Sequence, residues 1–363
     1  MRKRRCAGGL LGFVASLLVL AVLIAGCGRP SPGGQQGTGT QGGSQPSQSS
    51  DRTYRVAMII AQGGLGDQSY NDLAYAGLQK AARDFQNVEV QTIESPDVVN
   101  QGEALLRQAA QSGYDLVLTL EYSHFDPLPR VARDFPDTKF AIVNVEVKEP
   151  NVNSILFEEH QGSFLAGALA ALVTRDTSIP GINDKKVIGV IGGTKSPGID
   201  KFLVGYEEGA HYIDPEVQVI ATYSNNFGDP TLGRELALAQ MEQGADIVYH
   251  VAGGTGAGVI AAAQERGVYA IGVDSDQDGM APGHVLTSML KRVDVAVYDV
   301  IKRLAEGTLE AGATLRYGLD VGAVGLSEMK YTRDKIPAEY LAKVEELKQK
   351  IISGEIVVTD VTR

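Results

Sequence analysis

The chain has 363 residues, with 44 acidic and 33 basic side chains and a formal net charge of -11. An acidic chain without a basic stripe is a poor partner for nucleic acid, so this composition argues against DNA- or RNA-binding proteins. The only cysteines are Cys6 and Cys27, which precede the expected folded body. The sequence therefore predicts a fold without a disulfide, a thiolate metal site or a cysteine nucleophile.

The first 27 residues have the pattern of an export signal. Residues 2–5 are basic, an apolar run covers 10–24, and Ala25 and Gly26 lead into Cys27. This pattern predicts a signal peptide over 1–26. A single transmembrane anchor is the alternative, but a spanning helix needs about 20 apolar residues and no basic cluster follows the run.

The segment that ends at Cys27 resembles the lipobox of bacterial lipoproteins. That resemblance implies that Cys27 is diacylated on sulfur and becomes the N-terminus, which would anchor the protein on the extracytoplasmic face of the cell membrane. From 28 to 50 the chain is almost entirely Gly, Gln, Ser, Thr and Pro, so residues 27–52 are predicted to form the lipidated cysteine and a disordered tether.

The folded body alternates short apolar runs with segments of helical period. Strands are predicted at 55–61, 88–93, 115–120 and 139–145, with helices at 71–85 and 98–112. After a helix at 161–173, strands at 186–191, 216–222, 246–251 and 268–273 alternate with helices at 201–211, 231–243 and 257–265. This order predicts an α/β protein with two Rossmann-like lobes, whose ligand would lie beyond the carboxyl ends of the strands.

The loop after the first predicted strand, residues 62–72, has the sequence QGGLGDQSYND. Its glycines allow a tight turn, and Asp67 or Ser69 can cap the next helix. Tyr70 and Asn71 offer an aromatic face and an amide to a cleft. A plain strand-to-helix turn with a cap explains the same residues, so both interpretations stay open.

This loop resembles the glycine-rich signature of the basic membrane protein family of substrate-binding lipoproteins, which includes purine-nucleoside receptors of ABC importers. Further matching segments occur in order at 158–167, 188–193, 202–209, 251–256, 271–277 and 288–292. The resemblance implies a type I periplasmic-binding-protein fold with three inter-lobe crossovers, near Phe157, Leu286 and Ala313. The expected parts are lobe 1 at 53–157 plus 287–312, lobe 2 at 158–286 plus 313–330, and a C-terminal helix and tail at 331–363.

The resemblance also implies a ligand site. Tyr70 and Phe227 match the two aromatic positions that sandwich the base in nucleoside-binding members. Asn71 and Asp126 match groups that meet the base edge, and Asp274 matches the carboxylate that accepts from ribose hydroxyls.

Lys291 resembles the family's cleft lysine, and Gly253 would let the backbone approach the ligand. Other roles remain open for three of these residues: Phe227 could pack within a lobe, Asp126 could cap a helix, and Lys291 could pair with Asp294.

Together these features predict a lipoprotein that captures a small ligand, a nucleoside, and delivers it to ABC permease subunits as a monomer. One departure from the family bears on the ligand: Ala61, followed by Gln62, stands where many nucleoside-binding members have an aspartate. A sensory receptor for another ligand, such as a sugar or heterocycle, would share every residue discussed.

An enzyme on a doubly wound fold is a further alternative, but the glycines at 253–258 lack a following Lys-Ser/Thr and there is no G-x-S-x-G elbow. His124, His160 and His250 lack metal-ligand spacing, so neither a metal nor a cofactor is predicted.

Overall fold

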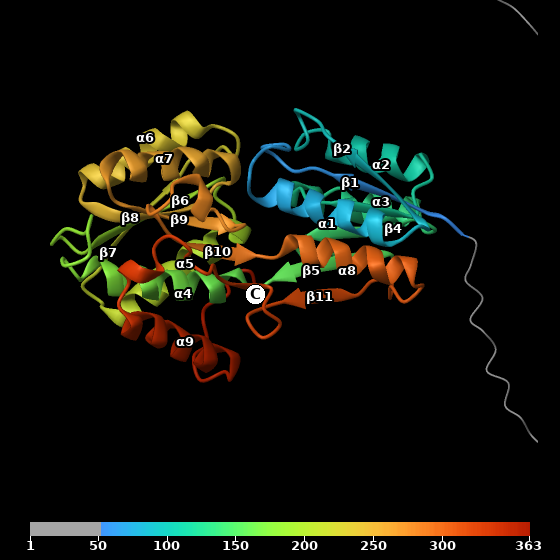
Figure 1. Ribbon diagram of the computed structural model, residues 1–363. Helices are drawn as coiled ribbons and strands as arrows, with labels where there is room; N and C mark the ends of the chain where they lie inside the picture. Colours follow the sequence, from blue (N-terminus) through green and yellow to red (C-terminus); the bar gives the residue numbers. More distant parts are fainter. Residues whose placement is uncertain (1–51) are drawn as a thin grey trace, which may run out of the picture. The chain divides into compact units, whose positions relative to one another are not determined.

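Two six-stranded sheets organise residues 52–363, the part of the chain that this computed structural model describes (Figure 1). The strands of the first sheet are β1 (Tyr54–Ile59), β2 (Val88–Ile93), β3 (Leu116–Thr119), β4 (Lys139–Val143), β5 (Val152–Phe157) and β11 (Thr314–Tyr317). The strands of the second are β6 (Val187–Gly192), β7 (Gln218–Tyr223), β8 (Ala245–Val251), β9 (Tyr269–Asp274), β10 (Val285–Lys291) and β12 (Val324–Leu326).

The first sheet has the order β11-β5-β4-β3-β1-β2, and all of its neighbouring strands are parallel. The second has the order β12-β10-β9-β8-β6-β7, with β12 antiparallel to β10 and the other pairs parallel. The predicted α/β class with two Rossmann-like lobes is confirmed.

Helices cover both faces of the first sheet, and together they form the first lobe. On one face, α1 (Tyr70–Asp84) packs beside α8 (Val293–Ala305), and Leu78 joins a core with Val56 and Met58 of β1. On the other, α2 (Gly102–Gln111) and α3 (Leu128–Asp134) cover Ala57 and Ile59. Because β1 is buried on both faces, successive residues are apolar instead of alternating with polar ones.

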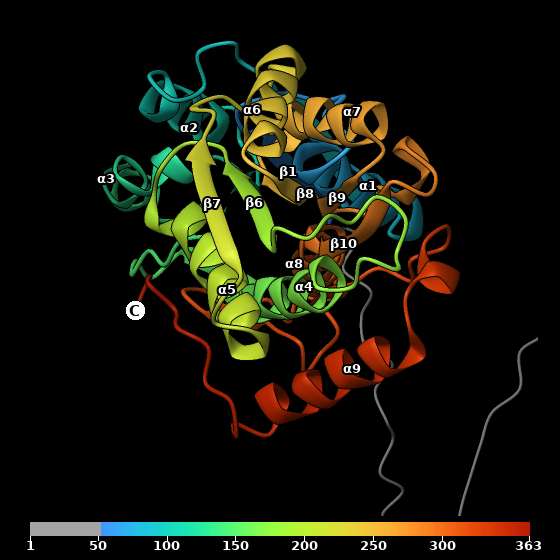
Figure 2. The same ribbon diagram turned by 90° about the vertical axis from the view of Figure 1, so that its left-hand side faces the viewer.

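The second lobe has the same layering around the second sheet. Figure 2 shows α6 (Pro230–Glu242) and α7 (Gly256–Arg266) on one face and α4 (Glu159–Thr174) and α5 (Pro197–Ile213) on the other. The C-terminal helix α9 (Ala338–Ile352) packs on the outer side of α4. Since α4 lies between the sheet and these helices, it is apolar almost all round, as a fully enclosed helix should be.

The chain changes lobe after Phe157, Lys291 and Tyr317. The second and third of these positions lie a few residues beyond Leu286 and Ala313, near which the crossings were expected. The pairing of β10 with β9 continues through Leu290, so residues 287–291 belong to the second sheet. Strand β11 adds to the edge of β5, so residues 314–317 belong to the first sheet. Apolar runs do not reveal on which sheet a strand pairs, and this is why the sequence misassigned both short segments.

Helices α4 and α5 approach closely at two glycines. A Cβ on Gly167 would lie 1.9 Å from the backbone oxygen of Tyr206, and a Cβ on Gly209 would lie 1.9 Å from that of Phe164. Backbone atoms cannot yield as a flexible side chain can, so this contact requires glycine on both helices.

We expect Gly209→Ala to lower the free energy of unfolding by about 1–3 kcal/mol, the usual cost of overpacking a core. Alanine favours a helix over glycine by about 1 kcal/mol, which only partly offsets the clash. Urea unfolding measures the change. Gly325→Ala is the matched control, because a Cβ there has nothing within 4 Å. Equal stabilities of Gly209→Ala and the native protein would contradict the close approach.

Candidate functional site

A cavity of about 270 Å³, here called the inner cavity, lies between the lobes at the carboxyl ends of the strands. In the first sheet the chain passes from β1 to β2 on one side and then to β3 on the other side of β1. In the second sheet β7 and β8 flank β6 in the same way. Loops diverge at such a point and leave a crevice where ligands bind in doubly wound folds. The architecture therefore makes this cavity the candidate binding site.

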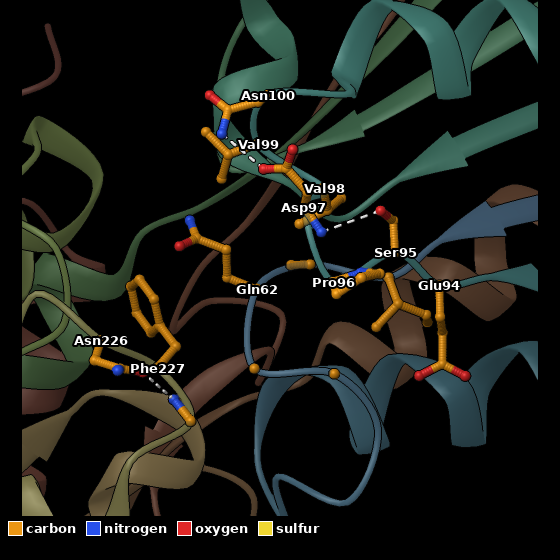
Figure 3. Close-up of a pocket in the computed structure, with 15 residues that line it drawn as sticks. Gln62, Glu94, Ser95, Pro96, Asp97, Val98, Val99, Asn100, Asn226 and Phe227 are labelled. Atoms are coloured by element: carbon orange, nitrogen blue, oxygen red, sulfur yellow. Dashed lines mark hydrogen bonds between the residues drawn. The ribbon is translucent and has the colours of Figure 1, made fainter.

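A second, outer cavity of about 740 Å³ adjoins the inner one. Both are lined by Ala61, Gln62, Val99 and Phe227. Figure 3 shows the outer cavity, with Gln62 from the first lobe and Phe227 from the second on adjacent sides. These shared residues separate the inner cavity from the wider space outside it.

The loop at 62–72 is held by Asp67, a buried carboxylate. It accepts hydrogen bonds from the backbone N–H groups of Ser69, Asn71 and Asp72 at 2.9, 2.9 and 3.1 Å. Burial raises the pKa of Asp67, and these hydrogen bonds oppose the rise without cancelling it. Of the two caps that the sequence left open, the structure therefore selects Asp67.

Asn71 braces the same loop against the end of β1. Its Oδ1 accepts from the N–H of Ala61 at 3.0 Å, and its Nδ2 donates to the backbone oxygen of Gln62 at 3.2 Å. Asn71 lines the inner cavity. Its amide, however, is already engaged with the backbone on both ends.

Tyr70 and Phe227 line the inner cavity, one from each lobe. The Tyr70 hydroxyl donates to the backbone oxygen of Leu120 at 3.1 Å and accepts from Nδ2 of Asn144 at 3.2 Å. Burial raises its pKa well above the usual value, so the hydroxyl stays protonated. The partner that a buried tyrosine hydroxyl needs is thus supplied by the protein itself.

Two glycines lie close to Phe227, one beside its ring and one beside its backbone. A Cβ on Gly193 would lie 2.1 Å from the ring, and one on Gly253, where φ is +54°, would lie 3.2 Å from the backbone oxygen of Phe227. Gly253 also lines the inner cavity. The structure therefore uses Phe227 at the cavity and not solely in packing within its lobe.

Asp274, the last residue of β9, also lines the inner cavity and is 6% exposed. Its Oδ2 accepts a hydrogen bond from the hydroxyl of Ser69, in the other lobe, at 2.5 Å. Burial raises its pKa to about 6, although the positive charge of Lys291 opposes this. Its φ of +65° lies in the left-handed region, which a residue with a Cβ seldom adopts, so the backbone is strained at the cavity wall.

Lys291, at the end of β10, lines the inner cavity and is buried. Its Nζ donates to Oδ1 of Asn144 at 2.6 Å and lies 2.8 Å from Oε1 of Glu159. The Nζ is also 5.1 Å from the centroid of the Tyr70 ring. Lys291 does not pair with Asp294, whose partner is Arg292, two residues before it.

Asp126 does not line either cavity, which corrects the sequence-based expectation. A short 3-10 helix, Tyr122–Phe125, turns the chain after β3 and leaves Asp126 exposed. The carboxylate that this loop brings to the inner cavity is instead Glu121, which is buried and accepts from the N–H of Gln62 at 3.1 Å.

Sequence reasoning missed Glu121 and Asn144, although both follow strands closely. Glu121 comes two residues after the end of β3, and Asn144 comes directly after β4 with a φ of +76°. Polar residues at strand ends were the signal that would have found them.

Among the described residues, one group away from the cavities has the side chains of a possible metal site. Ligand atoms of Glu158, His160 and Asp360 lie within 4.8 Å of one another. Arg363 approaches Glu158 at 2.7 Å and Asp360 at 2.9 Å, so a guanidinium already balances both charges. None of these residues lines either cavity.

Comparison with known proteins gives the family. Residues 54–362 match the family described as "ABC transporter substrate-binding protein PnrA-like". The chain belongs to the basic membrane protein family. Similar relatives include a "CD4+ T-cell-stimulating antigen" of Listeria innocua, 35% identical over 99% of both chains. An uncharacterized lipoprotein of Pyrococcus abyssi is 32% identical over 98% of this chain and 92% of its own.

A solved structure of a solute-binding protein of an ABC transporter system from Aeropyrum pernix K1 has a TM-score of 0.77. It is 31% identical to this chain, and the match covers 84% of this chain and 94% of the solved one. The chain therefore has the type I periplasmic-binding-protein fold, and its family consists of substrate-binding proteins of ABC transporters. In residues 52–363 no helix is both long enough and apolar enough to span a membrane, and Cys27 with its signal pattern lies outside the described residues.

We expect Asp274→Asn to stabilise the ligand-free protein at pH 7. The pKa of Asp274 is raised on folding, so the folded state binds the proton more tightly than the unfolded chain. Ionisation therefore lowers stability as the pH rises from about 4 to about 6, and the loss is complete above that window. Each unit of pKa shift corresponds to about 1.4 kcal/mol, which predicts a gain of about 1–3 kcal/mol.

Urea unfolding at pH 4 and pH 7 measures this, with exposed Asp126→Asn as control. The gain should shrink at pH 4, where both states hold the proton. If the stability of Asp274→Asn depended on pH in the same way as that of the native protein, ionisation of Asp274 would not lower the stability of the fold.

Proposed function

We propose that this protein binds a nucleoside in the inner cavity and delivers it, as a monomer and without any chemical step, to an ABC permease. The observation that carries the proposal is the combination of Tyr70 and Phe227, one from each lobe, with the buried carboxylate of Asp274 on the same small cavity. A nucleoside has a flat base, which could stack between the two aromatic rings, and a pair of ribose hydroxyls, which could donate hydrogen bonds to the carboxylate.

Stacking would supply affinity. An aromatic side chain stacked on a base contributes about 1–3 kcal/mol and accepts any base. The remaining walls suit a heterocycle, because Ile199, Phe202 and Val251 add apolar surface from the second lobe. Identity of the base must then come from polar groups at its edge.

Glu121 is the carboxylate best placed for that edge. It lines the inner cavity and takes the place that the sequence assigned to Asp126. Ala61 lines the cavity too but offers no side-chain acceptor, and the amide of Asn71 is engaged with the loop. With fewer free polar groups at the base edge, discrimination among bases should be weaker than discrimination for the sugar.

The sugar is the part of the ligand that Asp274 would recognise. A carboxylate offers two oxygens to two vicinal hydroxyls, and charge-assisted hydrogen bonds contribute about 1.5–3 kcal/mol each. Ser69 already donates to Oδ2, which orients the group from the opposite lobe. Closure of the lobes and binding of the ribose would thereby use the same carboxylate.

We expect a ribonucleoside such as inosine to bind at least about tenfold more tightly than its 2′,3′-dideoxy analogue, since at least one charge-assisted hydrogen bond is lost. Asp274→Ala should abolish this preference instead of weakening both ligands equally. Calorimetric titration of inosine, guanosine, adenosine, uridine and the dideoxy compound measures it, with Asp126→Ala as the matched control. Absence of binding by every ribonucleoside at millimolar concentration would reject the nucleoside ligand.

Attachment to the membrane through Cys27 is the second part of the proposal. It is supported by the lipobox pattern at residues 24–27 and by relatives that carry the name lipoprotein. Two or three acyl chains hold a protein firmly on a bilayer. The bound protein would then stay close to its permease on the extracytoplasmic face.

Cys27→Ser should move the protein from the membrane fraction to the soluble fraction while leaving ligand affinity unchanged, because the folded body begins only near residue 53. Fractionation and titration of the same preparation measure both effects, with Cys6→Ser as control. Firm membrane attachment of Cys27→Ser would rule out the lipid anchor.

A further inference from the structure

Three charged side chains are buried together behind the inner cavity. Glu159 begins α4, Lys201 belongs to α5 and Lys291 ends β10, and none is more than 3% exposed. The two lysines take different oxygens of the carboxylate: Lys201 contacts Oε2, and Nζ of Lys291 lies 2.8 Å from Oε1. Lys201 also donates to the backbone oxygen of Phe157, where the chain first leaves the first lobe, at 2.9 Å.

Of these three residues, only Lys291 lines the inner cavity. From Lys291 the contacts continue into the first lobe: its Nζ donates to Asn144, and Asn144 donates to the hydroxyl of Tyr70. A continuous chain of polar contacts therefore connects Lys201, outside the cavity, to the aromatic wall inside it.

The charges of this network depend on one another. A buried ion is costly unless it is paired, and removal of one partner leaves an uncompensated charge. Burial by itself would raise the pKa of Glu159, but the two lysines outweigh it and hold that pKa below its usual range. Glu159 is thus a carboxylate shared between two cations, and a loss of either cation would leave its full charge to the other.

We infer that Glu159 and Lys201 are positioning residues for ligand binding, which act by holding Lys291 on Asn144 at the cavity wall. Without Lys201, the whole charge of Glu159 draws Lys291 away from Asn144, and Asn144 then loses its hold on Tyr70. The effect on affinity rests on the proposed function, whereas the effect on Lys291 does not.

A crystal structure of ligand-free Lys201→Met tests the positioning directly. We expect Nζ of Lys291 to leave Oδ1 of Asn144, and the additional exchange Glu159→Gln to restore the contact because it removes the unbalanced charge. An unchanged contact between Lys291 and Asn144 in Lys201→Met would overturn the inference. If that variant fails to fold, Lys201→Gln replaces it, since glutamine can still donate to Phe157 while lacking the charge.

Titration with inosine tests the consequence for binding. Lys201→Met should weaken binding about tenfold, and the same change in a Lys291→Ala background should have no further effect, because the action passes through Lys291. The double variant Glu159→Gln/Lys201→Met should bind more tightly than Lys201→Met alone. Lys343→Met is the control, since Lys343 pairs with Glu346 on α9.

The outcomes separate the two proposals. Equal, additive losses with and without Lys291 would indicate a general structural role for Lys201 and overturn the inference. If the native protein binds no inosine or any other ribonucleoside, the proposed function fails, and the crystal structure of Lys201→Met still decides the inference by itself.

Discussion

The ion pairs of Glu159 with Lys201 and Lys291 are the interaction on which the arrangement of the cleft depends. Glu159 follows the first crossing between lobes, and Lys291 immediately precedes the second. Buried charges tolerate little change in geometry, because each must keep its partner. The point at which the two lobes join is consequently also the point that orients the polar wall of the inner cavity.

The wall of the cleft contains a residue whose backbone and charge are both unfavourable. Asp274 combines a left-handed backbone with a carboxylate whose pKa is raised by burial. Across the cleft, the hydroxyls of Ser69 and Ser275 donate to Asp274 and to the backbone oxygen of Gln68, so a few polar contacts link the lobes. Strain and unfavourable ionisation at a site are typical of positions retained for binding, and they are sustained here by the packed sheets behind them.

Close packing of two helices in the second lobe supports the buried ion pairs. Helices α4 and α5 approach so closely at Gly167 and Gly209 that their backbones touch. Glu159 and Lys201 lie on these same two helices, so the close packing fixes the distance between the carboxylate and one of its lysines.

The sequence by itself determined the α/β class and the two lobes, because buried parallel strands are apolar throughout. Tyr70, Phe227, Asp274 and Lys291, which the family resemblance implied, line one cavity because loops at the carboxyl ends of parallel strands converge.

Only the tertiary structure decided which carboxylate of the loop after β3 reaches the cavity, because one short 3-10 turn exposes Asp126 and leaves Glu121 inside. It also decided on which sheet β10 and β11 pair, and that Glu159 and Lys201 meet Lys291. These are contacts between residues far apart in the chain, and no local spacing or composition encodes them.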